Sequence, residues 1–247
     1  MIKLGSNSIG KIYFGSNSIG KAYYGSDLVF QKGGSPLPYT SVSYIQTDGT
    51  AYIDTGINGN YPKSVEMKIV PVAPSDTMAL LGSKSSSNNY PFVIAGQWGS
   101  SVGSYSNYLY YSYGTITTEG LPIASSITNQ TPVIIRSSLG PPTTKFAIKQ
   151  DGDSSFTEIT FATTRQVNSN LNMFLFARNE DGVAGALAAS GTKLNYCKIY
   201  GDLDLGGTLL FDGVPAYYNG EYGLWDKVSN AFFGNVASSG AFTGPQI

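Results

Sequence analysis

The sequence predicts an all-β chain: an antiparallel β-sandwich of jelly-roll type, preceded by a short N-terminal element of β repeats. The chain has 18 Tyr and 12 Phe, and such aromatic residues suit pleated, half-buried strands. Short segments of alternating apolar and polar residues recur at intervals of roughly 10–15 residues, with Gly, Asn and Ser between them. Such spacing is typical of the strands of a β-sandwich. The best helix candidate, Asp181–Ser190, is too short and too rich in glycine to form alone.

The chain opens with a repeat. The segment Gly5–Lys11 (GSNSIGK) returns as Gly15–Lys21, and a degraded third copy follows. A period of ten residues fits one strand plus one tight turn, so we expect strands such as Ser8–Phe14 and Ser18–Tyr24. A segment this short cannot bury an apolar face by itself and needs a partner surface.

We therefore expect residues 1–34 to be an anchor or oligomerisation element, with an edge sheet of the main domain as the alternative. The glycine- and proline-rich sequence up to about residue 38 is typical of a linker. The expected anchor residues are Ile9, Ile12, Tyr13, Phe14, Ile19, Tyr23 and Tyr24.

Residues 39–247 form the expected sandwich domain. Asp151-Gly152 lies between two alternating runs and predicts a tight hairpin from Lys145–Gln150 to Phe156–Phe161. The expected strands are Thr40–Gln46, Ala51–Thr55, Ser64–Val72, Thr77–Ser83, Pro91–Gly96, Tyr105–Tyr111, Pro132–Ser138, Thr143–Gln150, Ser155–Phe161, Asn172–Arg178, Lys193–Tyr200 and Gly207–Val214.

Composition excludes several functions. Charged residues are 13% and the net charge is −1, which argues against nucleic-acid binding and against a polybasic membrane surface. There is no histidine and Cys197 is the only cysteine, so a Ser–His–Asp triad, a Cys–His pair, His-ligated zinc and an internal disulfide are excluded. We expect Cys197 in the core. The first residues lack the apolar segment of a secretory signal, and no apolar run of 18 residues predicts membrane insertion.

Five sequence blocks in order carry a resemblance: Tyr44–Gly56, Leu80–Lys84, Leu175–Gly182, Lys193–Leu203 and Leu209–Pro245. Together they resemble the concanavalin A-like, laminin-G-like jelly-roll domains of bacteriophage structural proteins, which also occur on surface proteins of gut bacteria. The opening KIYFG and KAYYG repeats resemble short repeats near the start of such phage proteins.

The resemblance implies a non-enzymatic virion protein, a fibre or appendage of head or tail, assembled in the host bacterial cytoplasm. Its N-terminal repeats would attach to capsid, portal or tail proteins. Its jelly roll would make protein or host-glycan contacts. A homo-oligomer is implied, with a trimer as the usual form of phage fibres. The family commonly has an Arg-Asp pair before its Val-Pro, whereas this chain has Phe211-Asp212, so no ion-pair role passes to Asp212.

Two other functions remain open. A bacterial lectin-like surface module would share the fold, although such a protein normally needs a secretion signal. A glycan hydrolase is the remote alternative, because such enzymes need two carboxylates about 5–9 Å apart, for example on one face of a strand. The nearest pairs lie in expected turns, so we name no catalytic residue: Asp202 and Asp204, Asp151 and Asp153, Glu180 and Asp181, and Glu221 with Asp226.

Calcium is a second ligand hypothesis, and no other cofactor is expected. The resemblance implies Ca²⁺ at a loop rim, held by carboxylates, amides and carbonyl oxygens. Weak candidates by residue type are Asp48, Asp54, Asn58, Asn179 and Asp181. Their spacing does not group them, and solvated turn residues are the alternative.

Aromatic side chains could contact a glycan, because their faces stack on sugar rings. The candidates are Trp98, Tyr105, Tyr108, Tyr110 and Tyr113. Tyr110 is adjacent to Tyr111, so the two must point to opposite sides of a strand, and we expect at least one in the core.

Overall fold

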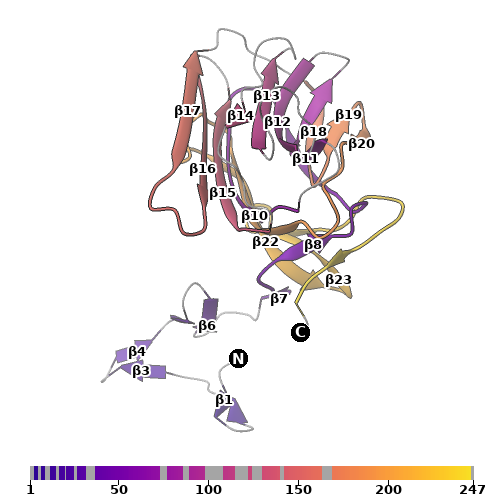
Figure 1. Ribbon diagram of the computed structural model, residues 1–247. Helices are drawn as coiled ribbons and strands as arrows, with labels where there is room; N and C mark the ends of the chain where they lie inside the picture. The colour runs from indigo at the N-terminus through magenta and orange to yellow at the C-terminus, as the bar shows by residue number, and fades with distance from the viewer. Residues whose placement is uncertain are drawn as a thin grey trace. The chain divides into compact units, whose positions relative to one another are not determined.

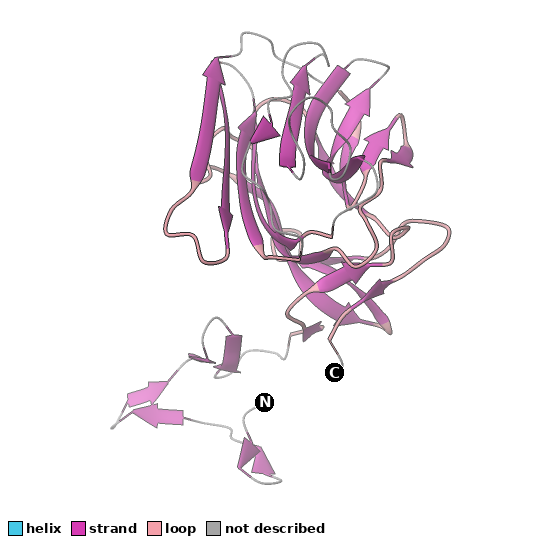
Figure 2. Ribbon diagram, in the orientation of Figure 1, coloured by secondary structure: helices cyan, strands magenta, loops and turns pink. Residues whose placement is uncertain are grey.

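The structure is a computed structural model (Figure 1), which describes most of the chain. All elements in the described part are strands, which confirms the all-β prediction (Figure 2). Those residues therefore include no helix that could cross a membrane. The described residues are 3–4, 7–8, 12–14, 17–19, 21–24, 27–31, 37–72, 77–85, 89–97, 108–114, 122–123, 130–139, 142–162 and 169–245.

The chain divides into two compact units, Met1–Pro38 and Tyr39–Ile247. The first unit contains three hairpins, each a two-stranded antiparallel sheet of its own. They are β1 (Lys3–Leu4) with β2 (Asn7–Ser8), β3 (Ile12–Phe14) with β4 (Asn17–Ile19), and β5 (Lys21–Tyr24) with β6 (Asp27–Gln31).

The ten-residue period is a period of hairpins. The pairs Leu4↔Asn7, Phe14↔Asn17 and Tyr24↔Asp27 each enclose the dipeptide Gly-Ser. The single strands expected over Ser8–Phe14 and Ser18–Tyr24 are wrong, because each is divided between two hairpins. The sequence signal for these hairpins is the Gly-X dipeptide, which favours a two-residue connection.

Six of the expected anchor residues lie on these strands. They are Ile12, Tyr13 and Phe14 in β3, Ile19 in β4, and Tyr23 and Tyr24 in β5. Ile9 lies outside the described residues.

The second unit is an antiparallel β-sandwich of two sheets (Figure 1). The larger sheet has the order β17 (Thr157–Ala162), β16 (Thr143–Gln150), β15 (Val133–Leu139), β10 (Lys63–Val70), β21 (Lys193–Tyr200), β22 (Leu209–Tyr218), β23 (Glu221–Asp226) and β24 (Ala231–Phe233). The smaller sheet has the order β14 (Pro122–Ile123), β13 (Tyr108–Gly114), β12 (Asn89–Gln97), β11 (Thr77–Ser85), β18 (Asn172–Leu175) and β9 (Ile53–Asn58).

Short strands complete the two sheets. In the larger one, β7 (Thr40–Ser41) pairs with β22, and β8 (Ile45–Thr47) pairs with both β21 and β25 (Phe242–Thr243). The start and the end of the second unit therefore share a sheet. In the smaller one, β19 (Arg178–Glu180) pairs with β11 in parallel and with β20 (Val183–Gly185) in antiparallel fashion.

One apolar core fills the space between the sheets. On β10, Val65, Met67 and Ile69 are at most 2% exposed, while Glu66 and Lys68 are only partly buried. This period of two is what places one face of a strand against a core and the other outward. Cys197 belongs to the same core and is fully buried, as expected.

Several strand boundaries differ from expectation for identifiable reasons. The strand expected over Asn172–Arg178 is split, because Phe176 has φ +65° and the chain reverses there, from β18 antiparallel to β11 to β19 parallel to it. The hairpin at Asp151-Gly152 forms, but its innermost pair is Ile148↔Thr157, so the connection is longer than the tight turn expected.

Candidate functional site

The outer face of the larger sheet, which is the face opposite the core, carries a row of charged side chains. Cross-strand partners alternate in charge except at one alanine. Direct cross-strand pairs of opposite charge stabilise a sheet by about 0.2–1 kcal/mol each. From β17 to β22 the row is Glu158, Ala147, Arg136, Glu66, Lys198 and Asp212.

Arg136 is held at the centre of this row. Its Nε donates to Glu66 Oε2 at 2.7 Å, and its guanidinium carbon lies 4.2 Å from the centroid of the Phe156 ring. The other oxygen of Glu66 accepts from the Tyr196 hydroxyl at 3.2 Å. Burial and the Glu66 carboxylate both raise the pKa of Tyr196, so this hydroxyl stays a donor. Arg136 is therefore oriented by Glu66 and Phe156, and Glu66 in turn by Tyr196, although the Arg136 side chain is 44% exposed.

A cleft of about 270 Å³ opens beside Arg136. Its walls come from β15, β16, β17 and the connection between β21 and β22. The lining includes Lys145, Ala147, Glu158, Leu203 and Asp204. Ala147 lies between Arg136 and Glu158 in the sheet register, and its methyl group leaves room between these two longer side chains. The smallest residue in the row is thus the floor of the hollow.

The β21–β22 connection is tied to the sheet. Ser138 Oγ on β15 donates to the Leu203 carbonyl at 2.6 Å, and Asp202 Oδ2 accepts from Thr208 N at 2.7 Å. Gly206 N donates to Asp204 Oδ1 at 3.1 Å, which leaves the second oxygen of this carboxylate without a partner among the described residues. The wall of the cleft opposite β17 is therefore a braced loop that presents a carboxylate.

This arrangement can bind a small polar ligand. Lys145 is exposed, and within the described part of the chain no acceptor is bonded to its ammonium group or to the terminal nitrogens of Arg136. Glu158 Oε1 accepts from the Thr160 hydroxyl, and Glu158 Oε2 has no partner among the described residues. The cleft thus offers cationic donors on one side and carboxylate acceptors on the other.

Sequence reasoning did not identify Arg136, Lys145 or Glu158. A signal was present, because the predicted hairpin joined Lys145–Gln150 to Phe156–Phe161 and so brought Lys145 and Glu158 onto neighbouring strands. Arg136 alternates with buried Ile135 and Ser137 on the preceding strand, which marks it as outward-facing.

The expected glycan-contact aromatics belong to a different part of the fold. Tyr108, Tyr110 and Tyr113 lie on β13 of the smaller sheet, whereas the cleft lies on the larger sheet. The other two, Trp98 and Tyr105, lie outside the described residues.

The calcium candidates serve turns. Asp48 accepts from Thr50 N, Ala51 N and Ala241 N, and these bonds outweigh its slight desolvation and lower its pKa to about 2. It begins the turn that carries the chain from β8 in the larger sheet to β9 in the smaller one. Asp181 has φ +52° in the two-residue connection between β19 and β20, where such a conformation is required.

Two other calcium candidates, Asp54 and Asn179, are both hydrogen-bonded to Asn172. Asp54 accepts from Gly56 N at 2.8 Å and from Asn172 Nδ2 at 3.3 Å, and Asn179 Nδ2 donates to the Asn172 carbonyl at 2.9 Å. Asn179 Oδ1 accepts from Gly182 N at 2.7 Å. Among the described residues, no three acidic, His or Cys side chains gather in a geometry that could hold a metal ion.

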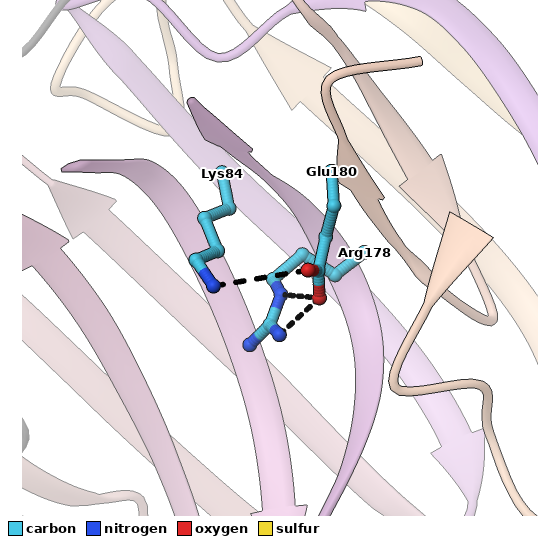
Figure 3. Close-up of polar contacts among 3 residues, drawn as sticks. All are labelled: Lys84, Arg178 and Glu180. Carbon is cyan, nitrogen blue, oxygen red and sulfur yellow. Dashed lines mark hydrogen bonds and ion pairs between the residues drawn. The ribbon is translucent and has the colours of Figure 1, made fainter. Parts of the chain in front are cut away.

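A second polar cluster, beside Asn179, is an ion-paired group (Figure 3). Glu180 on β19 accepts from Arg178 of the same strand and pairs with Lys84 of β11 at 3.7 Å. These two cations outweigh the desolvation of Glu180 and lower its pKa. A Cβ on Gly185 would lie 2.6 Å from Glu180 Cδ, so the carboxylate lies over this glycine. The cluster joins β11, β19 and β20, and its three charged side chains bind one another, which favours a structural role.

At least one member of each carboxylate pair considered for hydrolysis is also engaged in a turn. Asp153 Oδ2 accepts from Gln150 N at 2.9 Å, and the Asp202 and Asp204 bonds described above hold the β21–β22 connection. Asp226 is 2% exposed and accepts from Asp212 N, Val228 N and Ser229. Their oxygens therefore fix backbone groups.

No protein-family model matches the chain, and no curated protein is significantly similar to it in sequence. Some solved structures are similar to part of the chain. A native heptameric SAP-like pentraxin from Limulus polyphemus is 11% identical, with a TM-score of 0.48 over 68% of this chain and 79% of the pentraxin. The CBM40 of a Ruminococcus gnavus IT-sialidase is 10% identical, with a TM-score of 0.45 over 68% of this chain and 92% of the module.

A full-length tailspike protein 2 from Escherichia coli O157:H7 bacteriophage CAB120 is 12% identical, with a TM-score of 0.48 over 67% of this chain. The match spans 23% of the tailspike. Likenesses at these levels of identity concern the fold alone.

Proposed function

We propose that the chain is a non-enzymatic structural protein of a bacteriophage particle, in which residues 1–38 assemble and attach the protein and residues 39–247 form a contact module. The observation that carries this proposal is the modular plan. Three hairpins of one design make up one compact unit, and a sandwich with its own core makes up the other. The five sequence blocks that resemble phage structural proteins agree with this plan.

The attachment role follows from the size of the hairpins. A two-stranded hairpin is marginal in water by itself, and each hairpin of the first unit has only two to five residues per strand. Such an element gains stability when it pairs or packs with further strands. The three hairpins have the same register at the two residue pairs next to the turn, so tandem copies suit repeated contacts with copies of this chain and with capsid, portal or tail proteins.

The contact role follows from the outer face of the larger sheet. The cleft beside Arg136 is formed by rigid strands and a braced loop, and it contains donors and acceptors that have no partner within the described residues. Multiple copies on a particle would convert weak binding at each cleft into avidity. The same cleft favours a bacterial carbohydrate-binding surface module as the second candidate function.

Deletion tests the proposal. In the phage genome that encodes the chain, removal of residues 1–38 should give particles that lack the protein, while the remaining sandwich accumulates as soluble protein. A matched variant with a filled cleft, Ala147→Leu, should enter particles normally. Particles that incorporate residues 39–247 at the level of the full chain would contradict attachment by the hairpins.

A further inference from the structure

We infer that the cleft beside Arg136 binds one ring of an acidic saccharide, with the carboxylate of the sugar at Arg136 and Lys145 and its hydroxyl groups at Glu158 and Asp204. This inference deepens the contact role of the sandwich and rests on it, but it does not depend on how the hairpins attach.

The cationic side of the cleft is suited to a carboxylate. The guanidinium of Arg136 is fixed by Glu66 at its Nε and by the Phe156 ring beneath it, so its terminal nitrogens form a pre-oriented fork. Lys145 is the diagonal cross-strand neighbour of Arg136, since Lys145 pairs with Ser138 and Ala147 pairs with Arg136. Diagonal neighbours lie about 7–8 Å apart, within reach of long side chains, so one carboxylate can contact both cations.

The acceptor side of the cleft is suited to hydroxyl groups. Glu158 lies two strands from Arg136, which is about 10 Å across the sheet, with the methyl group of Ala147 between them. Asp204 stands on the braced loop, and each of these carboxylates has one oxygen without a partner among the described residues. Hydroxyl groups of a sugar donate to such oxygens, and the apolar edges of Phe156, Leu203 and Leu205 can face its C–H groups.

Size and charge together select this ligand class. About 270 Å³ lies just below the usual range of about 300–1,000 Å³ for ligand pockets, so the cleft accepts one small ring. A neutral sugar would leave the Arg136 fork bonded only to water, and a simple anion would leave the exposed carboxylates of Glu158 and Asp204 bonded only to water. A ring that bears both a carboxylate and hydroxyl groups satisfies the two sides at once.

The test is a titration of the full chain with D-glucuronate, followed by NMR or calorimetry. D-glucose is the matched probe, because it differs by lacking the carboxylate, and acetate and glycine carry a carboxylate without the ring. We expect a Kd on the order of 1 mM for glucuronate, the affinity that ordinary ligand efficiency gives a molecule of this size, and weaker binding of the other three. Equal binding of glucose, acetate or glycine, or no binding of glucuronate, would overturn the inference.

Variants locate the binding. Arg136→Gln and Lys145→Gln should each weaken glucuronate binding roughly tenfold, while Lys149→Gln, on the same face of the same strand but outside the cleft, should leave it unchanged. Ala147→Leu should block the cleft without removing a charge. Unchanged binding in Arg136→Gln and Ala147→Leu, both verified as folded by thermal unfolding, would refute this site. Particle incorporation is a separate readout, so failure here and failure of attachment are distinguishable.

Discussion

Asp226 holds the closing hairpin of the sandwich, and its substitution gives the sharpest stability prediction. The carboxylate is 2% exposed and accepts four hydrogen bonds: Asp212 N at 2.7 Å, Val228 N at 3.1 Å, Ser229 N at 2.9 Å and Ser229 Oγ at 2.6 Å. Two of these, from Asp212 and from the Ser229 hydroxyl, are the shortest. Val228 and Ser229 lie in an exposed turn, where water can replace the carboxylate at their backbone N–H groups.

The expected loss of unfolding free energy follows from the hydrogen bond that water replaces least well, which is the bond from Asp212 N on β22. A hydrogen bond to a charged group contributes about 1.5–3 kcal/mol, so loss of the bond from Asp212 N in Asp226→Ala should cost at least about 1.5–3 kcal/mol. Asp226→Asn keeps an acceptor on one side only and should cost about half of that. A control is Asp151→Asn, an exposed turn residue, which should stay within about 0.5 kcal/mol of the parent chain.

The assay is urea-induced unfolding at pH 7 and at low pH. Burial alone raises the pKa of Asp226, but the bonds from Ser229, Asp212 and Val228 outweigh burial, and the pKa lies below its ordinary value. The contribution of Asp226 is therefore complete above the unfolded pKa of about 3.9 and declines as the pH falls through the folded value. The difference between parent and Asp226→Asn should shrink in acid. A difference under about 0.5 kcal/mol for Asp226→Ala at pH 7 would refute the reasoning.

Three further predictions concern the ends and the core of the sandwich. Because the pKa of Asp48 is lowered to about 2, its contribution should be present above about pH 4 and lost towards pH 2, so Asp48→Asn should flatten the acid limb of a stability profile. Phe242→Ala should cost about 3–5 kcal/mol in urea unfolding, since this ring is 5% exposed and packs 5.3 Å from Phe176, whereas the 52% exposed Val236 should tolerate alanine. Burial raises the pKa of the Cys197 thiol, so an aromatic disulfide reagent should react with it only in urea; rapid reaction of the native chain would contradict its place in the core.

Local signals predicted much of the strand content. The expected strands Thr143–Gln150 and Lys193–Tyr200 have the observed bounds, although the second has a break in its alternation between Leu194 and Cys197, where its pairing with β10 shifts register. Asp48-Gly49 is the kind of dipeptide that forms a turn between two strands, and it is a turn, but it connects the two sheets. Which sheet a strand joins depends on pairing partners distant in sequence, so a local pattern does not carry that information.

The candidate site was harder to predict for the same reason. Arg136, Ala147 and Glu158 lie on three strands and form one row only through sheet register. Sequence reasoning favoured conspicuous aromatics near Trp98, and it gave little weight to an alanine that matters because it is small. Contacts with residues distant in sequence explain the closing segment Gly240–Pro245. A Cβ on Gly240 would lie 2.7 Å from Asp48 Oδ2, and the Tyr222 hydroxyl donates to the Pro245 carbonyl at 2.9 Å.

We propose that residues 1–38 assemble the protein and residues 39–247 form a contact module. The most direct test is the mass in solution of the full chain and of residues 39–247, measured by light scattering. The sandwich has its own core and both of its end strands within residues 39–247, so the shorter chain should be a folded monomer. The full chain should be a discrete homo-oligomer held together by its hairpins. A monomeric mass for each of the two chains, or an oligomer formed by residues 39–247 alone, would contradict the assignment of assembly to the N-terminal hairpins.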